Sequence, residues 1–424
     1  MFSKILNTFS TKFITAIINF FIAVIISQYL GATGKGEQGI IITTITLILI
    51  FSNLIGGPSI VYLVPRHPLQ RIVIPAYAWS LLTSIIFFFI MNLVYIVKPE
   101  YILHVVILTT INSFASINNS VLIGKEKIKT NNYINLLQTI VIIGSLLFFF
   151  NIQNKIEIYS YIKALYFGFG INFILGFIFI IPFFKKQINP TGKFNEALQG
   201  LLKFGFWNQL GTIAQMLSFR ISYYFIEYFN GTKDVGIYSN GISIIESVWL
   251  VTTSITLVQY SRIVNSENNE YSQKLTIRLT RISLLSIFFI LIPLVLLPSS
   301  FYTFIFGHEF GDINKVIWTL APGVLIFNIV NITGHYFSGT GKYHINALAM
   351  GVGFAATLIF GLILIPLYGI IGAGITASIS YIVTAIVISI IFSKEAKCRI
   401  IDLMPKPGDI KNYYNEFILL FQKK

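Results

Sequence analysis

Charged residues and cysteine are scarce in this chain, and each shortage excludes a class of protein. Only 11% of the 424 residues are charged, 55% are hydrophobic and the mean hydropathy is +0.77. Soluble globular domains carry roughly 25% charged residues, so a soluble fold is excluded. The single cysteine, Cys398, rules out an intramolecular disulfide framework and a multi-cysteine metal site.

Motifs for catalysis and for cofactor binding are also missing from the sequence. It has no glycine-rich phosphate loop, no exposed nucleophile motif and no cysteine pair. The nearest approach to an acid-base or metal site is His308 and Glu309 beside Asp312, in the longest predicted outer loop. We therefore expect a protein that is not an enzyme, with no catalytic residue, no metal and no cofactor.

What the chain does have is a series of apolar runs long enough to cross a bilayer, which takes about 20 residues. They predict an all-α integral membrane protein with about 12 transmembrane helices. The first six runs cover residues 13–29, 38–64, 72–97, 101–123, 132–150 and 159–184, and the second six cover 204–229, 235–260, 275–297, 313–338, 343–367 and 370–393.

The two sets of six predict two lobes around a central cavity. The N-terminal lobe covers residues 1–184, a polar cytoplasmic connector covers 185–203, the C-terminal lobe covers 204–393, and a cytoplasmic tail covers 394–424. In the tail, Ile410, Tyr413, Phe417 and Phe421 recur at helical spacing among charged residues. This pattern is typical of a short helix that lies on the membrane surface.

The net charge of +14, from 30 basic and 16 acidic residues, is explained by the orientation of the spans in the membrane. If the N-terminus is cytoplasmic, most Lys and Arg residues fall in inner segments, as the positive-inside rule requires. The cations are scattered between apolar runs and form no exposed basic face, so nucleic acid is not an expected partner. Both termini are predicted to be cytoplasmic, and the outer loops hold six cations: Lys35, Lys98, Lys155, Lys163, Lys233 and Lys315.

A short motif recurs in the two halves. The spacing Gly-x-x-Lys-x-x-x-Asn runs from Gly124 to Asn131 after the fourth predicted span, and from Gly339 to Asn346 after the tenth. The repeat supports a duplicated six-helix unit. Because six spans is an even number, both copies would insert in the same orientation, as in transporters built of parallel repeats.

Three segments resemble the polysaccharide transporter family of the multidrug/oligosaccharidyl-lipid/polysaccharide exporter superfamily. They are YLGATGKGE at 29–37, GTGK at 339–342 and LIPLYGIIGAGITA at 364–377. The family includes Wzx-type O-antigen flippases of the bacterial inner membrane. The resemblance implies a MATE-like fold, alternating access, and an undecaprenyl-pyrophosphate-linked oligosaccharide carried from the cytoplasmic to the periplasmic face. Its implied partners are this lipid-linked substrate, membrane lipids and a polysaccharide polymerase.

One cation, Arg220, lies inside an apolar run. An arginine in mid-span costs about 2.5 to 3.5 kcal/mol on insertion scales, so it normally faces a cavity or a partner. It could bind the carrier pyrophosphate bidentately or pair with Glu227 or Glu246. Helical spacing places polar residues on or near the same face of this span, and we expect substrate contacts from Gln209, Gln215, Arg220, Tyr223 and Tyr224.

Other polar residues in the spans are weaker candidates. Glu246, deep in the eighth span, could couple transport to a cation or simply form a structural pair, and Glu227 is a second coupling candidate. Arg66 and Arg71 could attract an anionic headgroup to an inner gate, or serve only the positive-inside rule. Amide and imidazole groups suit either sugar hydroxyls or helix packing, and the ones we single out are Asn19, Asn53, Asn331 and His335.

Three rival functions are considered. A cation-coupled multidrug exporter of the same fold would normally carry an acid inside the N-terminal lobe, but Glu37, Glu100, Glu126 and Glu157 all fall at predicted loops. A membrane glycosyltransferase or O-antigen polymerase would need a sizeable external loop, and the predicted outer loops are short. A lipid II flippase usually has fourteen spans and a more cationic cavity. The flippase for an O-antigen or related repeat unit is therefore the favoured interpretation.

Overall fold

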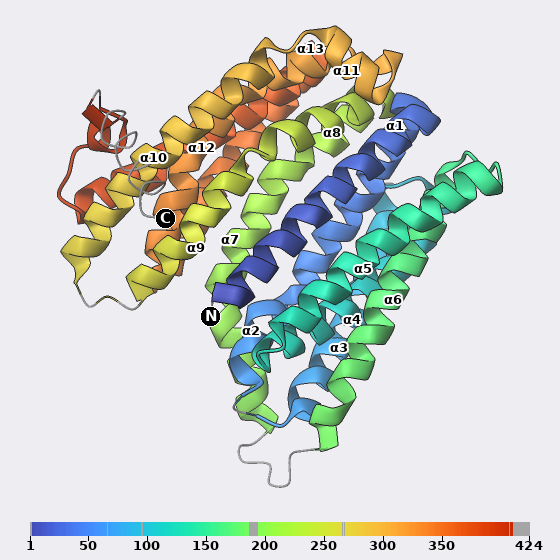
Figure 1. Cartoon of the computed structure of the whole chain (residues 1–424), viewed down its shortest axis with the longest axis horizontal. Helices are drawn as coiled ribbons and strands as arrows, with labels where there is room; N and C mark the ends of the chain where they lie inside the picture. The colour runs from blue at the N-terminus through green and yellow to red at the C-terminus, as the bar shows by residue number, and fades with distance from the viewer. Residues whose placement is uncertain are drawn as a thin grey trace. The chain divides into compact units, whose positions relative to one another are not determined.

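The computed structural model describes residues 2–65, 67–94, 96–185, 194–264, 266, 268–406 and 408–409. Within these ranges the chain forms helices and no strand. The helices group into two compact units, which are described separately (Figure 1). Unit 1 comprises Met1–Ile213 with Ile305–Gly307, and unit 2 comprises Ala214–Phe304 with His308–Lys424.

Unit 1 contains the helices up to the first part of α7. Their order is α1 (Phe2–Ser52), η1 (Asn53–Ile55), α2 (Gly57–Leu63), α3 (Leu69–Val94), α4 (Pro99–Gly124), α5 (Ile128–Leu147), η2 (Phe148–Ile152), α6 (Ile158–Lys185) and the start of α7 (Phe194–Phe229). The long α1 is two helices joined at Gly31, whose φ of 66° and ψ of −170° are not helical. A residue with a side chain rarely adopts such a conformation, so the chain reverses at a glycine.

Unit 2 contains the remainder of the chain. It consists of the rest of α7, then α8 (Thr232–Glu246), α9 (Trp249–Val264), α10 (Asn269–Leu296), α11 (Ser299–Phe306), η3 (His308–Phe310), α12 (Ile313–Gly339), α13 (Tyr343–Glu395) and η4 (Ile400–Leu403). Helices α8 and α9 together form one broken span, bent by 42°. The break follows directly after Glu246, the last residue of α8.

Helix α13 is a hairpin of two antiparallel arms that meet at Gly369, where φ is 57°. Residues at similar distances from this turn, one on each arm, lie close to each other. A Cβ on Gly372 would lie 2.0 Å from the Leu364 carbonyl oxygen, and one on Gly353 would lie 2.0 Å from Thr384 Oγ1. The Ser380 hydroxyl donates to the Gly353 carbonyl oxygen over 2.8 Å. Small residues thus let the two backbones approach closely, as is common between helices in membranes.

The predicted number of spans agrees with the described helices. Eight helices are long and apolar enough to cross a membrane, and the bent α8–α9 pair makes nine. Dividing α1 and α13 at their glycines and counting the 36-residue α7 brings the total to the predicted 12. The chain is therefore an all-α, multi-span membrane protein.

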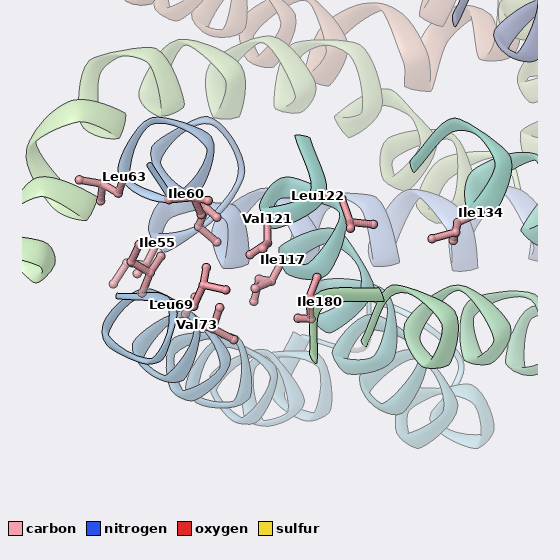
Figure 2. Packing of buried hydrophobic residues seen from close by; sticks show 13 residues of the cluster. Ile55, Ile60, Leu63, Leu69, Val73, Ile117, Val121, Leu122, Ile134 and Ile180 are labelled. Carbon is pink, nitrogen blue, oxygen red and sulfur yellow. The ribbon is translucent and has the colours of Figure 1, made fainter. Parts of the chain in front are cut away.

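An apolar cluster lies at one end of unit 1, where α2 to α6 meet. The predicted second span is broken at Asn53–Gly57, which sets the short helix α2 against α3 and α4. Figure 2 shows Leu69, Val73 and Ile117 beside one another in this cluster. Residues Ile117 and Val121 recur every four positions on α4, so one face of that helix packs here and leaves another face for different contacts.

The repeated sequence motif forms the same turn in both units. The N–H of Lys127 donates to the Leu122 carbonyl oxygen over 2.8 Å, and the N–H of Lys342 donates to the Phe337 carbonyl oxygen over 2.7 Å. The preceding residues, Glu126 and Gly341, both have positive φ, 58° and 78°. The turn therefore has the same backbone geometry in both halves. At the position with positive φ, the first half has a glutamate and the second half has a glycine.

Three predicted boundaries differ from the structure. The loop expected at 30–37 is helical except at Gly31. The connector expected over 185–203 is helical from Phe194 onward, because α7 begins there. The outer loop expected at 298–312 contains the helix α11 and the short turn η3. The proposed surface helix of the tail, with Ile410 to Phe421, and the gate residue Arg66 lie outside the described residues.

Candidate functional site

Arg220 forms an ion pair with Glu246 inside unit 2. Its Nη2 lies 3.1 Å from Glu246 Oε2, and the two side chains are 24% and 12% exposed. Helix α7 supplies the arginine, and the C-terminal residue of α8 supplies the carboxylate. The hydroxyl of Tyr381, on α13, donates to Glu246 Oε1 over 2.9 Å. Glu246 is thus held between a cation and a hydroxyl, one on each carboxylate oxygen.

Aromatic rings surround this ion pair. The Arg220 guanidinium lies over the ring of Tyr223, 5.7 Å from its centroid, a distance typical of a cation–π contact. Phe219 contacts Trp249, Phe327 and Tyr381 with centroid separations of 5.0 to 5.7 Å. These rings come from α7, α9, α12 and α13. They cover part of the pair and leave it partly exposed, with the arginine side chain 24% accessible.

The guanidinium of Arg220 is only partly satisfied. Its Nη2 is bound to Glu246, whereas its Nη1 is buried and has no hydrogen-bond partner among the described residues. A buried donor without a partner is costly, and such groups in native proteins often mark a binding function. Nη1 is closed off by its surroundings in this structure, so an anionic oxygen can bond to it, with the Glu246 pair kept in place, only after neighbouring side chains move.

The other predicted residues of α7 have separate environments. Gln209 belongs to unit 1, is buried, and donates to the Ile50 carbonyl oxygen over 2.7 Å. Tyr223 is buried and packs edge-to-face on Tyr238. Gln215 and Tyr224 are half-buried in unit 2. Of the stripe expected on α7, the structure brings Arg220 and Tyr223 together with Glu246.

Glu227 does not bond Arg220, and Glu309 bonds neither His308 nor Asp312 in the contacts described here. Glu227 Oε1 accepts a hydrogen bond from the Thr232 hydroxyl over 2.8 Å, at the start of α8. Glu309 pairs with Lys233 over 3.1 Å. In the described part of the chain, no group of three or more His, Cys, Asp and Glu residues is arranged to hold a metal ion.

Asn331 and His335 lie on α12 of unit 2. The Nδ1 of His335 lies 2.7 Å from the Asn331 carbonyl oxygen, and the exposed imidazole ring packs edge-to-face on Tyr260. The backbone contact leaves Nε2 as the ring atom that can reach a ligand. Nothing in these contacts joins the two residues to the Arg220 pair.

The predicted residues of unit 1 are not gathered in one place. Asn19 is exposed on the first arm of α1, and Arg71 is half-buried in the first turn of α3. Asn53 lies at the break between α1 and α2, and its Oδ1 accepts a hydrogen bond from the Ser116 hydroxyl over 3.3 Å. Ser116 in turn lines a polar pocket on the far side of α4 from the apolar cluster.

Sequence reasoning missed Tyr381. It sits in an apolar run with no charged neighbour, and its role depends on α13 packing beside α8. A tyrosine in mid-span offers a weak signal, because an aromatic residue there is usually packing. Only the contact with Glu246 distinguishes it.

The described part of the tail is fixed to unit 2 by charge. Asp402 in η4 accepts hydrogen bonds from the Lys406 ammonium over 3.0 Å and from the Arg399 backbone N–H over 3.1 Å. These donors lower the pKa of the Asp402 carboxyl, with the hydrogen bond from Lys406 as the largest cause. Arg281 on α10 donates from Nε to the Asp402 carbonyl oxygen over 2.8 Å.

Comparison with known structures shows which fold this is. Lipid II flippase MurJ in an inward closed conformation matches with a TM-score of 0.73 and 17% identity, over 97% of this chain and 91% of that one. An inward-facing multidrug resistance MATE transporter of the MOP superfamily matches with a TM-score of 0.65 and 15% identity, over 90% of this chain and 94% of that one. The fold is therefore that of MurJ and the MATE transporters.

Two curated relatives match in sequence. The capsular polysaccharide biosynthesis protein CapF of Staphylococcus aureus is 26% identical over 201 residues, which is 47% of this chain and 50% of the relative. An uncharacterized membrane protein of Methanocaldococcus jannaschii is 24% identical over 216 residues, 50% of this chain and 42% of the relative. The matches thus span half or less of each relative's length.

The family model described as "Polysaccharide biosynthesis protein" matches residues 2–260, more than half of the chain. Together with the MurJ-like and MATE-like fold, this match confirms the family that the three sequence segments resemble. The chain belongs to the polysaccharide biosynthesis protein family.

Proposed function

We propose that this protein is a flippase for a lipid-linked oligosaccharide. It would carry an undecaprenyl-pyrophosphate-linked repeat unit, for O-antigen or a related polysaccharide, from the cytoplasmic to the periplasmic face of the inner membrane by alternating access. Family membership and the fold of MurJ support a transporter of polysaccharide precursors rather than an enzyme. The match to CapF supports a role in surface polysaccharide assembly.

The observation that carries the proposal is the half-satisfied guanidinium of Arg220. A cation inside an apolar helix is expensive, and the pair with Glu246 uses only one of its two terminal nitrogens. A pyrophosphate presents several anionic oxygens, and Arg binds such groups through parallel N–H donors. Glu246, itself hydrogen-bonded to Tyr381, would hold the guanidinium in position, and movement of the surrounding side chains would open Nη1 to the phosphate.

The topology that goes with this function places both termini in the cytoplasm, because most cations then lie inside. Arg66 and Arg71 would attract the anionic headgroup to the inner leaflet. A negative-inside potential would itself favour outward movement of an anionic headgroup. The undecaprenyl tail would stay in the bilayer, and the polymerase that uses the flipped unit would be a partner on the outer face.

The test is replacement of Arg220 in cells that depend on this protein for surface polysaccharide. Arg220→Ala should abolish surface polysaccharide when it is compared at equal amounts of protein in the membrane, because the phosphate loses its cation. The control is Lys274→Ala, which removes a cation that is exposed and paired only with Glu270 on the same helix. Normal polysaccharide in Arg220→Ala would contradict the phosphate role. Full activity of Arg220→Lys would contradict only the bidentate geometry.

A second candidate is a cation-coupled multidrug exporter. It is favoured by the likeness to MATE transporters and by Glu246, a carboxylate inside a membrane-spanning segment. Under this alternative, Glu246 would bind the coupling cation and Arg220 would release it. Dye and antibiotic accumulation in cells lacking the protein decides between the two: increased accumulation with intact surface polysaccharide would favour the exporter.

A further inference from the structure

A polar pocket lies within unit 1, apart from the residues on which the proposed phosphate contact rests. Its volume is about 320 Å³, and six amide side chains on α4, α5 and α6 line it: Asn112, Asn119, Asn131, Asn135, Gln138 and Asn172. We call it the amide pocket. Asn112 and Asn119 share one face of α4 with Ser116, while Ile117 and Val121 face the apolar cluster.

None of the residues that line the amide pocket is charged. A phosphate placed there would find no cation to neutralise it, and a buried unpaired charge is strongly unfavourable. A neutral ligand with many hydroxyl or amide groups has no such penalty. The lining therefore selects against the pyrophosphate and in favour of an uncharged, hydrogen-bonding group.

The amides form a network in which most acceptors are already used. Asn119 Nδ2 donates to Asn135 Oδ1 over 3.3 Å and to Asn172 Oδ1 over 3.2 Å. Asn172 Nδ2 donates to Asn135 Oδ1 over 3.0 Å and also to Gln138 Oε1. Asn135 Nδ2 donates to the carbonyl and side-chain oxygens of Asn131. These bonds fix the orientation of the amides before any ligand arrives, which lowers the entropic cost of binding.

One acceptor is left over at the centre of this network. Asn119 Oδ1 is buried and has no hydrogen-bond partner among the described residues. A free carbonyl oxygen needs a donor, which a sugar hydroxyl or an acetamido N–H supplies. Asn118, the next residue on α4, shows the contrast: its amide is fully engaged by the Tyr77 hydroxyl and the Phe173 carbonyl oxygen, as packing requires.

A metal cation fits this arrangement poorly. Oxygen-ligated ions such as Ca²⁺ take six or more oxygens, commonly including carboxylates. Here the lining has no carboxylate, and the oxygens of Asn135, Asn172 and Gln138 already accept amide hydrogens. Binding a cation would require several of these hydrogen bonds to break at once.

We infer that the amide pocket binds one neutral sugar residue of the transported headgroup, through its hydroxyl or acetamido groups. The inference rests on the proposed flippase function and assigns its sugar contacts to unit 1. The pocket would then bind the uncharged part of the substrate. Specificity for one sugar over another would depend on the shape of this pocket rather than on Arg220.

The experiment measures sugar binding directly on the full-length protein in lipid nanodiscs. Glucose, galactose and N-acetylglucosamine are added separately, and the thermal unfolding midpoint is compared with that in glycerol of equal osmolality. A ligand that binds the folded state raises the midpoint in proportion to the logarithm of its concentration above Kd. At least one sugar should raise the midpoint in the wild type.

Three variants locate the binding. Asn119→Ala removes the free acceptor and should abolish the shift. Asn112→Phe fills the pocket from a position that takes no part in the amide bonds described above, and it should abolish the shift without weakening the network. The matched control is Asn92→Ala, an exposed asparagine on α3 that bonds only the Phe88 carbonyl oxygen, and it should keep the shift. A sugar shift that survives Asn112→Phe, or no shift with any of the sugars, overturns the inference.

An isosteric variant separates sugar binding from cation binding. Asn119→Asp keeps the shape but adds a negative charge, so it should weaken a sugar site and strengthen a cation site. Exchange of KCl for NaCl should leave the wild-type midpoint unchanged. A sodium-dependent shift that grows in Asn119→Asp would replace the sugar inference with a cation site.

Failure of this inference is distinguishable from failure of the flippase proposal. The first is read by sugar binding to the purified protein, and the second by surface polysaccharide in Arg220 variants. Loss of polysaccharide in Arg220→Ala with no sugar shift would keep the flippase and remove the amide pocket as its sugar site.

Discussion

The polar centres of the two units differ in chemistry. In unit 2, a charged pair of Arg220 and Glu246 is enclosed by aromatic rings. In unit 1, the amide pocket has several neutral side chains bonded to one another and no charge in its lining. The first arrangement suits an anionic phosphate, and the second suits an uncharged sugar. A substrate that carries both groups would thus meet one centre matched to each.

The largest expected effect comes from breaking the charged centre on one side only. Arg220→Met leaves Glu246 partly buried without its cation, and removal of one partner of a buried pair typically costs about 3 to 5 kcal/mol. The pair is somewhat exposed, so the lower end of that range is expected. The double variant Arg220→Met with Glu246→Gln should recover most of the stability and none of the transport. Unfolding midpoints and surface polysaccharide are the measurements, and recovery of transport would make the pair merely structural.

The next effect sharpens the contrast between binding amides and packing amides. Asn328 in unit 2 is buried and exchanges hydrogen bonds with Ser283, so its amide serves packing. Interhelical hydrogen bonds of this kind contribute about 0.6 to 1.7 kcal/mol. Asn328→Ala should therefore lower stability by that amount and leave transport per folded molecule unchanged. Asn135→Ala, in the amide pocket, should lower both. Equal transport per folded molecule in the two variants would contradict the distinction between amides that bind substrate and amides that only pack.

The hydroxyl that positions Glu246 gives a third test of the charged centre. Tyr381→Phe keeps the aromatic packing and removes one hydrogen bond to a charged group, worth about 1.5 to 3 kcal/mol at full strength. The ion pair remains, so transport should fall several-fold without being lost. Transport that is equal to wild type would show that Arg220 alone holds the carboxylate.

The smallest effect lies outside both centres, at Asp402. Its lowered pKa means that the contacts of the carboxylate with Arg399 and Lys406 inside the tail are present above the ordinary pKa of an aspartate and are lost as pH falls through the lowered value. Asp402→Asn should therefore remove the acid-dependent opening of the η4 turn, with little change in transport. Hydrogen exchange of residues 399–403 at two pH values is the measurement. Identical pH dependence in wild type and variant would contradict the assignment.

Parts of the fold could be predicted because they depend on local sequence. Apolar runs gave the spans, and the repeated Gly-x-x-Lys-x-x-x-Asn motif forms the same turn after α4 and α12. Separate first and second spans were predicted, but a loop was expected at 30–37 because glycines are frequent there, whereas the structure is helical except at Gly31. Likewise the predicted span 38–64 continued across the break at Asn53–Gly57, because apolar residues lie on both sides of it.

The candidate site was predictable only in part. Arg220 stood out because charge in an apolar run is visible in sequence. The partner of Arg220 could not be identified from the sequence, because Glu227 and Glu246 were both candidates. The packing of α7 beside α8 pairs it with Glu246. Helical spacing places Asn112, Ser116 and Asn119 on one face of α4, but nothing in the sequence shows that α5 and α6 turn their amides toward the same point.

The sequence by itself determined that this chain crosses a membrane many times, carries one arginine inside a span and repeats a turn in its two halves. Each of these follows from composition or from spacing along one helix. The tertiary structure alone decided the partner of Arg220, the role of Tyr381 and the existence of the amide pocket. The physical reason is that a period of 3.6 residues fixes which side chains share a face of one helix, whereas the helix that meets that face is chosen by packing between segments distant in the chain.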